Sequence, residues 1–419
     1  MATFQKERTG ERMLAVEEAQ ERVLTEIETI GVEKVSLRDA LGRVLREQIR
    51  APRDVPFGDN SAMDGYVLIA ADVAAASEGA PVHLRVTSDI PAGRVSSTRV
   101  ARGEAARIMT GALFPAGADA VVPVELTDAG SETVAVRAPV REGANVRLRG
   151  EDMKKGDLVI SVGARIGAAE IGVLAGVQRS LVRVGRRPVV AILSTGDEVV
   201  DVDGTFEPGK VVNSNSWSLA ALVRESGGVP RMLGIVEDSI DATVDAIRSG
   251  LESDFVLSTG GVSVGAFDFV KDALDRLGAE TRFWQVAMKP GKPLVVSRVG
   301  GRLYFGLPGN PVSCMVSFHL FVAPAIRKAA GQTHGLFPPT VRMKVSSDLR
   351  SRGDRRQYFR VRALARDGTL TAIPMTAQGS GVSTSMVAAN GLAIVEAGVK
   401  EIAAGSEVDV VMIGPVSAE

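Results

Sequence analysis

Apolar runs and helical patterns alternate through the middle of the chain. Between residues 186 and 331, short runs such as RPVVAILS, DFVLST and RLYFGL alternate with segments such as SIDATVDAIRSGLE, whose apolar residues recur at helical spacing. Strands that alternate with helices need crossover connections, so the pattern predicts a doubly wound, largely parallel α/β domain. Ligands of such sheets bind beyond the carboxyl ends of the strands, so the loops at those ends are where we expect a site.

Short β-rich runs separated by turn residues flank this domain on both sides. Residues 55–150 contain VHLRVTS, EAARIMT and DAVVPVEL, which predict a β-rich domain. The segment GQTHGLFPP is typical of a linker, and the residues after it predict a small C-terminal β domain with turns at RDG and ANG.

Helical patterns characterise the N-terminal region. Residues 14–29 predict an amphipathic helix, and SLRDALGRVL predicts a second, short helix with Ser36 as its N-cap. A further helix is predicted to begin near Ala168. The two N-terminal helices fit packing within their own domain as well as a dimer interface, and the pattern does not distinguish the two. The apolar face of the first helix consists of Val16, Ala19, Val23, Leu24 and Ile27.

Composition and charge exclude several classes of function. The 419 residues predict about three to four domains. A net charge of −1 and an aromatic content of 4% argue against binding to nucleic acid or to a membrane surface. The single cysteine, Cys314, excludes disulfides within the chain and thiolate metal sites, so any metal should be a hard cation held by carboxylates. No signal peptide or membrane span is predicted, so we expect a cytoplasmic protein.

The stretch STGGVSVGAFD, residues 258–268, joins a predicted strand to a predicted helix. Its glycines let backbone N–H groups approach a ligand, and the helix that follows presents the positive end of its dipole, so the loop suits an anion. The loop matches neither GxGxxG nor GxxxxGK[ST], so by itself it identifies no ligand.

Other predicted strand-end loops carry similar chemistry. STGDEVV, NSNSWS, EDS, MKPGKP and GLPGNPVS supply hydroxyls, carboxylates, glycines and two lysines. Carboxylates beside phosphate-binding backbone and lysines suggest a phosphoryl or nucleotidyl site with Mg²⁺. Each loop also has a purely structural explanation: Asp268, Asp238 and Ser239 suit helix N-caps, Asp197 and Glu198 a solvated turn, and Lys289 and Lys292 the protein surface.

Six stretches of the chain form a recognisable set. They are DNSAMDGY (59–66), IMTGALFPAGADAVVPVE (108–125), STGDE, STGGVSVGAFDFV, VAMKPGKP and GLPGNPVS. Together they resemble the molybdopterin molybdenumtransferases, a family that contains the bacterial MoeA proteins and the E domain of gephyrin. The resemblance covers nearly the whole chain, and this motif set is highly specific.

The resemblance implies four domains and a reaction. An elongated helical dimerisation domain would consist of residues 11–54 and 151–185, with a β domain inserted at 55–150. A molybdopterin-binding α/β domain would follow at 186–331, and a β-barrel-like domain at 335–419. The implied homodimer would take adenylyl-molybdopterin and molybdate, release AMP with the help of Mg²⁺, and produce Mo-molybdopterin. The adenylyltransferase that makes the substrate is a candidate partner.

The resemblance also assigns roles to residues of this chain. The implied catalytic residues are Asp59, Thr110, Asp152, Glu198, Asp238 and Asp268, of which Glu198, Asp268 and Asp59 would hold the metal. The implied substrate-binding residues are Ser258, Gly260, Gly261, Ser263, Gly265 and Ser313. The implied molybdate-binding residues are Lys289, Lys292, Arg360 and Ser380.

Two other functions fit parts of the sequence. A molybdopterin adenylyltransferase shares the α/β domain, but the additional N- and C-terminal domains argue against it. A non-catalytic scaffold is the second alternative, and the complete acidic and lysine motifs argue against a purely structural role.

Overall fold

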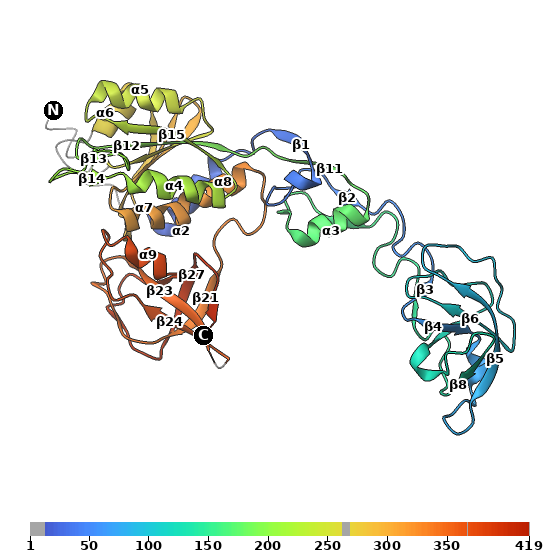
Figure 1. Ribbon diagram of the computed structural model, residues 1–419. Helices are drawn as coiled ribbons and strands as arrows, with labels where there is room; N and C mark the ends of the chain where they lie inside the picture. The colour runs from blue at the N-terminus through green and yellow to red at the C-terminus, as the bar shows by residue number, and fades with distance from the viewer. Residues whose placement is uncertain (1–12, 262–268, 367, 419) are drawn as a thin grey trace. The chain divides into compact units, whose positions relative to one another are not determined.

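The computed structural model describes residues 13–261, 269–366 and 368–418 (Figure 1). The predicted site residues Ser263, Gly265 and Asp268 lie outside the described residues. The chain divides into two compact units. The first unit contains Met1–Glu47, Val162–Ala168 and Leu181–Glu419, and the second contains Gln48–Ser161 and Ala169–Ser180.

A six-stranded sheet forms the centre of the α/β domain in the first unit. Its strands are, in spatial order, β15 (Val229–Val236), β12 (Val189–Thr195), β16 (Phe255–Thr259), β20 (Arg302–Leu307), β19 (Pro293–Val299) and β17 (Glu280–Gln285). The pairings of β12 with β15, β12 with β16, and β16 with β20 are parallel, whereas β19 pairs antiparallel with both of its neighbours. The predicted largely parallel sheet is therefore confirmed.

Helices cover both faces of this sheet because successive residues of each strand point to opposite faces. Val190 and Ile192 of β12 belong to a core shared with α4, α7 and α8, whereas Ala191 and Leu193 belong to a core shared with α5 and α6. Figure 1 shows α5 and α6 on one side of the sheet and α4 on the other. These helices are α4 (Ser214–Glu225), α5 (Ile240–Gly250), α6 (Phe269–Arg276), α7 (Pro311–Ser317) and α8 (Ala323–Ala329), with a π-helical segment (Phe318–Val322) between the last two. No helix in the described part of the chain is long and apolar enough to cross a membrane.

The N-terminal helix packs within its own chain. Helix α2 (Val16–Thr25) buries Val16, Ala19 and Val23 in the core that contains α8. Two side-chain hydrogen bonds fix this position: the Gln20 amide donates to Leu320 O at 3.0 Å, and Lys328 Nζ donates to Leu24 O at 2.7 Å. The apolar face of α2 is therefore used inside the chain, and the idea that it forms a dimer interface is wrong.

The second predicted N-terminal helix does not form. The segment SLRDALGRVL contains only a short 3₁₀ turn, Leu37–Asp39, and Ser36 bonds the Asp39 carboxylate instead of capping a helix. Val44 and Leu45 instead make β-bridges to Arg165 and Val184, which lie far along the chain. Strand β1 (Val32–Ser36) likewise pairs with β11 (Leu181–Gly185). Long-range strand pairing thus replaces the local helical pattern here, and this region is less helical than predicted.

The C-terminal domain is a closed β-barrel. Strand β23 pairs with both β24 and β25, and the pairings β24–β21, β21–β27 and β27–β25 complete the ring. Val361, Ala393 and Val410 are among the buried residues that fill it. This confirms the predicted barrel-like domain. The ring consists of β21 (Thr340–Val345), β23 (Arg356–Arg366), β24 (Thr369–Pro374), β25 (Gly391–Val395) and β27 (Glu407–Met412).

The second unit contains the predicted β-rich domain. Its main sheet has the order β7 (Ala120–Pro123), β4 (Gly65–Leu68), β6 (Glu104–Ile108), β5 (Val82–Ile90) and β8 (Thr133–Val136). Both faces are buried, one around Tyr66 and Leu68 and the other around Val67 and Ile108. The same unit holds the pairs β2 (Ile49–Arg50) with β10 (Leu158–Ile160) and β3 (Asn60–Ser61) with β9 (Val146–Arg147). Helix α3 (Ala168–Gly176) begins where the sequence predicts it.

Candidate functional site

A cavity of about 490 Å³ lies at the carboxyl ends of β12, β16 and β20, the edge at which the sequence places a site. The loops that follow these three strands form its wall, and the start of α4 and the start of α7 contribute to it. Lining residues from the predicted loops are Ser194, Thr195, Glu198, Val199, Asn213, Ser214, Asn215, Thr259, Gly260, Gly261, Pro293, Pro308, Gly309, Asn310 and Pro311.

The first glycines of the predicted anion loop line the cavity in conformations that favour glycine. Gly260 has φ +92° and Gly261 has φ +65°, both in the left-handed region. A Cβ at Gly260 would lie 2.6 Å from Thr195 O, and one at Gly261 would lie 2.8 Å from Thr195 Oγ1. Glycine is therefore required here both by the backbone conformation and by the close approach of the end of β12.

Asn215 connects three of the loops that surround the cavity. Its Nδ2 donates to Thr259 Oγ1 at 2.7 Å and to Gly309 O at 2.8 Å, so α4 is bonded to the ends of β16 and β20. Its Oδ1 and the hydroxyl of Thr195 are buried and have no hydrogen-bond partner in the described structure. Sequence reasoning does not select Asn215, although the run NSNS at the start of a helix, where apolar residues are expected, is a signal.

A second polar cluster holds the start of α4. Asn213 is the N-cap, and its Oδ1 accepts from Ser216 N at 3.2 Å and from Ser194 Oγ at 2.9 Å. The hydroxyls of Ser194 and Ser216 are 2.7 Å apart. These buried side chains satisfy one another, so they fix the helix relative to β12 and leave the adjacent wall of the cavity rigid.

The acidic residues after β12 and β15 lie in different surroundings. Glu198 is exposed and lines the cavity. Asp197 and Asp238 bond each other reciprocally: Asp197 N donates to Asp238 Oδ2 at 3.2 Å, and Asp238 N donates to Asp197 Oδ1 at 3.0 Å. The N-cap of α5 is Ser239, whose Oγ accepts from Ala242 N. Asp238 is thus not the cap, and its carboxylate joins two strand-end loops.

Two of the implied substrate-binding serines are buried. Ser258 is fully buried, and its Oγ forms a short hydrogen bond with the hydroxyl of Tyr304. Ser313 lies in α7 and is also buried. Neither side chain lines the cavity, although Thr259 and Pro311, close to them in sequence, do.

Residues 288–293, MKPGKP, which we call the lysine loop, connect the α/β domain to the C-terminal barrel. Strand β18 (Met288–Lys289) pairs with β23, with Lys289 opposite Gln357. Val286 N donates to Lys292 O at 3.0 Å, so the chain turns back on itself between these residues. Pro293, directly after Lys292, lines the cavity, whereas neither lysine is among the lining residues.

Arg360 and Ser380 belong to the part of the barrel that meets α7. Arg360 is 1% exposed, and its Nη2 donates to Ala377 O at 2.9 Å and to Gly379 O at 3.1 Å. Its Nε is buried without a partner in the described structure, and burial lowers the pKa of the guanidinium. Ser380 O accepts from Val312 N at 3.1 Å, next to the cavity residue Pro311. The residues 377–380 therefore adjoin one wall of the cavity.

Asp59, Thr110 and Asp152 lie in the second unit, and all three are exposed. Asp59 Oδ1 accepts from Arg149 N at 2.7 Å. Thr110 is held by Asp64, whose Oδ1 accepts from both its N and its Oγ1 at 2.7 Å. These bonds, led by the one from the backbone N–H, lower the pKa of Asp64. Asp64 is not among the site residues predicted from the sequence. In the structure it positions Thr110, which is one of them.

The described residues contain no group of three or more His, Cys, Asp and Glu side chains that could hold a metal ion. Of the three implied metal ligands, Glu198 is at the cavity, Asp59 is in the second unit, and Asp268 lies outside the described residues. A complete ligand set from this chain is therefore not assembled in the described part of the first unit.

The chain matches three family models that together span most of its length. Residues 14–177 match the MoeA N-terminal region (domain I and II), residues 191–328 match a probable molybdopterin binding domain, and residues 342–413 match the MoeA C-terminal region (domain IV).

Named relatives agree with these matches. A molybdopterin molybdenumtransferase from Bacillus subtilis is 37% identical over 96% of this chain and 94% of its own length. One from a Nostoc species is 41% identical over 78% of this chain and 76% of its own length. The crystal structure of a molybdopterin biosynthesis MoeA protein from Pyrococcus horikoshii is 29% identical, covers 96% of this chain and all of that chain, and has a TM-score of 0.81.

Proposed function

The chain belongs to the molybdopterin molybdenumtransferase family, and from that premise we propose that it inserts molybdenum into molybdopterin during molybdenum cofactor biosynthesis. The proposed substrates are adenylyl-molybdopterin and molybdate, and the proposed products are Mo-molybdopterin and AMP. The observation that carries the proposal is the cavity at the strand ends, which is lined by Gly260, Gly261 and the acidic residue Glu198.

The cavity suits a phosphoanhydride and its counter-ion. Gly260 and Gly261 line the cavity directly after β16, so their backbone is where we expect a phosphate group to bind. Glu198 offers at the cavity the carboxylate oxygens that Mg²⁺ prefers, and Mg²⁺ is commonly held by one or two carboxylates together with substrate phosphates. When bound, Mg²⁺ would supply positive charge that stabilises the phosphate oxygens during cleavage. Glu198 is the residue we expect to hold it, joined by Asp268.

We expect molybdate to be bound by cationic residues near the junction of the α/β domain and the barrel. The dianion needs positive charge and hydrogen-bond donors, which Lys289, Lys292 and Arg360 carry. Lys289 and Arg360 are linked through β23, which contains Arg360 and pairs with Lys289. The free Nε of Arg360 is a further donor in this region. The loop that contains Ser380 completes the set.

One assay tests this function. The purified protein is incubated with adenylyl-molybdopterin, Mg²⁺ and molybdate, and both AMP and Mo-molybdopterin are measured. We expect both products, and we expect Glu198→Gln to lower their rate by more than about tenfold without loss of the fold. Glu207→Gln is the matched control, because Glu207 is exposed in the connection before β14 (Val211–Val212) and does not line the cavity.

The same measurements, repeated with ATP and molybdopterin in place of adenylyl-molybdopterin, separate the alternatives. A molybdopterin adenylyltransferase would consume ATP and molybdopterin and form adenylyl-molybdopterin without molybdate. A scaffold would form neither product. Either result contradicts the proposal.

We further propose a cytoplasmic homodimer in which Asp59, Thr110 and Asp152 of one subunit act at the cavity of the other. The proposal is supported by the position of these residues in the second unit, whereas Glu198 belongs to the first. The adenylyltransferase that supplies the substrate is the proposed transient partner.

A further inference from the structure

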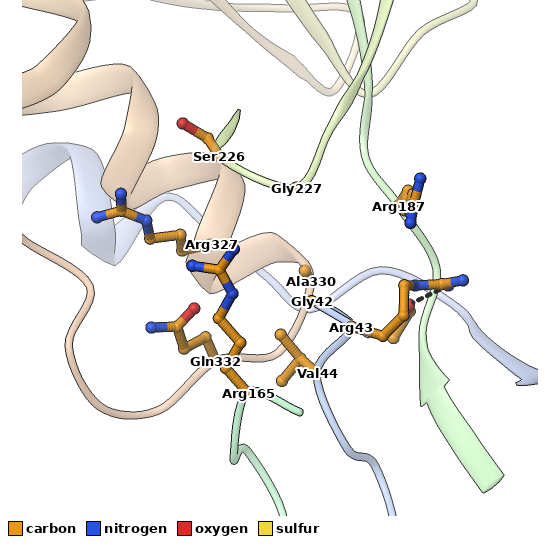
Figure 2. Close-up of a pocket in the computed structure, with 11 residues that line it drawn as sticks. Gly42, Arg43, Val44, Arg165, Arg187, Ser226, Gly227, Arg327, Ala330 and Gln332 are labelled. Carbon is orange, nitrogen blue, oxygen red and sulfur yellow. Dashed lines mark hydrogen bonds between the residues drawn. The ribbon is translucent and has the colours of Figure 1, made fainter. Parts of the chain in front are cut away.

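A small hollow in the first unit is lined by four arginines from four separate segments (Figure 2). Arg43 precedes β2, Arg165 lies before α3, Arg187 lies between β11 and β12, and Arg327 belongs to α8. No member of this group lines the cavity described above or takes part in the proposed reaction. We call this group the arginine hollow.

The positive charge of the arginine hollow is poorly balanced. Its lining residues include no carboxylate. Arg43 is paired with Glu33 and donates to Gly185 O at 2.8 Å, but its Nε is buried without a partner in the described structure. Among the described residues, Arg165, Arg187 and Arg327 make no ion pair with an acidic side chain. Arg327 uses Nη1 to donate to Leu336 O at 2.6 Å.

Arg165 and Arg327 are close enough to repel each other. The pKa of the Arg327 guanidinium is lowered mainly because burial disfavours its charge, and further because Arg165 is positive. In Figure 2 the Arg165 side chain extends from its loop toward the helix that carries Arg327. Arginine stays protonated at physiological pH, so this repulsion persists in the empty hollow. An anion at the Arg165 guanidinium would offset this repulsion.

The size of the hollow limits the kind of anion. Its accessible volume of about 10 Å³ accepts roughly one oxygen atom, so a ligand must place most of its atoms at the mouth. Arg165 and Arg187 are exposed there, whereas Arg43 is buried and Arg327 half-buried. A tetrahedral oxyanion can insert one oxygen and present others to the exposed Arg165 guanidinium, whose planar fork matches such geometry.

We propose that the arginine hollow binds a phosphate group, either as inorganic phosphate or as the end of a small phosphomonoester. Since three of its oxygens would remain at the mouth, an ester substituent can point into solvent. The bound group would join residues 42–46, 162–168 and α8. Backbone bonds already connect the first two of these segments: Gly42 N donates to Ile166 O at 2.8 Å and Leu45 N to Ala164 O at 2.9 Å.

The test is isothermal titration calorimetry on the full-length protein at low ionic strength, with inorganic phosphate and with glycerol 3-phosphate. Binding of both ligands supports a site for a terminal phosphate group, and binding of inorganic phosphate alone supports a site for the free ion. Arg165→Gln should weaken binding by about ten- to a hundredfold, because a charge-assisted hydrogen bond is lost. Arg352→Gln is the matched control, since Arg352 is exposed and lies outside the hollow.

Hydrogen–deuterium exchange on the same protein locates the ligand. Inorganic phosphate should slow exchange in residues 42–46 and 162–168, and Arg165→Gln should abolish this effect. Protection confined to residues 194–200 and 258–261 would place the phosphate in the large cavity and overturn the proposal. Unchanged affinity in Arg165→Gln, or no binding by the wild-type protein, would overturn it as well. Arg165 is exposed, so its replacement leaves the core intact.

Discussion

At the scale of single residues, Asn215 joins loops that are far apart in sequence. Replacing it with alanine removes both hydrogen bonds from Nδ2 and leaves Gly309 O without that partner. We expect Asn215→Ala to lower the free energy of unfolding by about 1–3 kcal/mol, because buried polar groups lose their partners. Urea denaturation measures this change.

The control for this prediction is Asn310→Ala. Asn310 lines the same cavity, but its side chain makes no cap hydrogen bond to α7. Its replacement should change the free energy of unfolding by less than about 0.5 kcal/mol. Equal losses in the two variants would mean that the bonds of Asn215 do not hold the loops together. A rise in KM that accompanies the loss of stability in Asn215→Ala would link the loop positions to substrate binding.

Cys314 gives a second prediction at this scale. The thiol is completely buried in α7, and burial raises its pKa to about 12 although Thr259 bonds to it. At pH 8 almost no thiolate is present, and the thiolate is the reactive form. We expect iodoacetamide to leave the native protein unmodified and to label it fully in denaturant, as read by mass spectrometry. Rapid labelling of the native protein would contradict the buried position.

At the scale of elements, the turn after β16 depends on its glycines, and Gly261→Ala tests this. Gly261 and Gly278 have nearly the same backbone angle, φ +65° and +66°. A methyl group at Gly261 would lie 2.8 Å from both Thr195 Oγ1 and Val270 Cγ2, whereas one at Gly278 would meet no described atom within 4 Å. Gly278→Ala should cost about 1–2 kcal/mol from backbone conformation alone. Gly261→Ala should cost more and should also abolish AMP release.

The two variants are compared by urea denaturation and by the AMP assay. Activity that survives in Gly261→Ala would show that the backbone near Thr195 tolerates a side chain, and would argue against a close approach by substrate at this turn. Activity lost equally in Gly278→Ala would point to a general effect of stability, because Gly278 lies beyond the end of α6 and does not line the cavity.

The strands and helices of the α/β domain are predicted well from the sequence because their patterns are local. Strand β16 begins with the apolar run Phe255–Leu257 and is buried on both faces, and α5 shows clear helical spacing with Ser239 as its cap. The segment after Ser36 is wrongly predicted as a helix because its partners, Arg165 and Val184, are distant in sequence. Asn215 is missed for the same reason, since its partners Thr259 and Gly309 become neighbours only in the folded sheet.

At the scale of the whole molecule, the proposed shared site predicts complementation between inactive variants. Glu198→Gln and Asp59→Asn should each be inactive alone. If Asp59 acts at the partner's cavity, a mixed dimer has one site with both changes and one site with neither. After subunit exchange, an equal mixture should therefore recover about a quarter of wild-type activity.

Two controls accompany the mixing experiment. Sedimentation equilibrium must show a dimer at micromolar concentration, and a monomer would refute the shared site. Mixing Glu198→Gln with Glu198→Ala should restore nothing, because every cavity then lacks Glu198. No recovery in the first mixture, with exchange verified by mass spectrometry, would assign Asp59 and Glu198 to the same subunit's site or Asp59 to no site.

Domain organisation is harder to predict from sequence than the domains themselves. The α/β domain and the barrel follow from pattern and family resemblance, but the same reasoning assigns α2 to a dimerisation domain. The structure shows its Val16, Ala19 and Val23 buried against α8 in the α/β domain. An amphipathic pattern identifies an apolar face without identifying what covers it, because the covering residues lie some 300 positions away in the chain.

The pairing of β18 with β23 limits how this protein can be recombined with its relatives. The C-terminal barrel forms a domain of its own. However, its strand β23 also pairs with Met288 and Lys289, which lie outside the barrel sequence. In a chimera that exchanges residues 335–419 alone, β18 of this protein would have to pair with β23 of a relative. Exchange of the barrel together with residues 286–293 keeps both strands of this pairing from one parent, so these segments should be transferred as one unit.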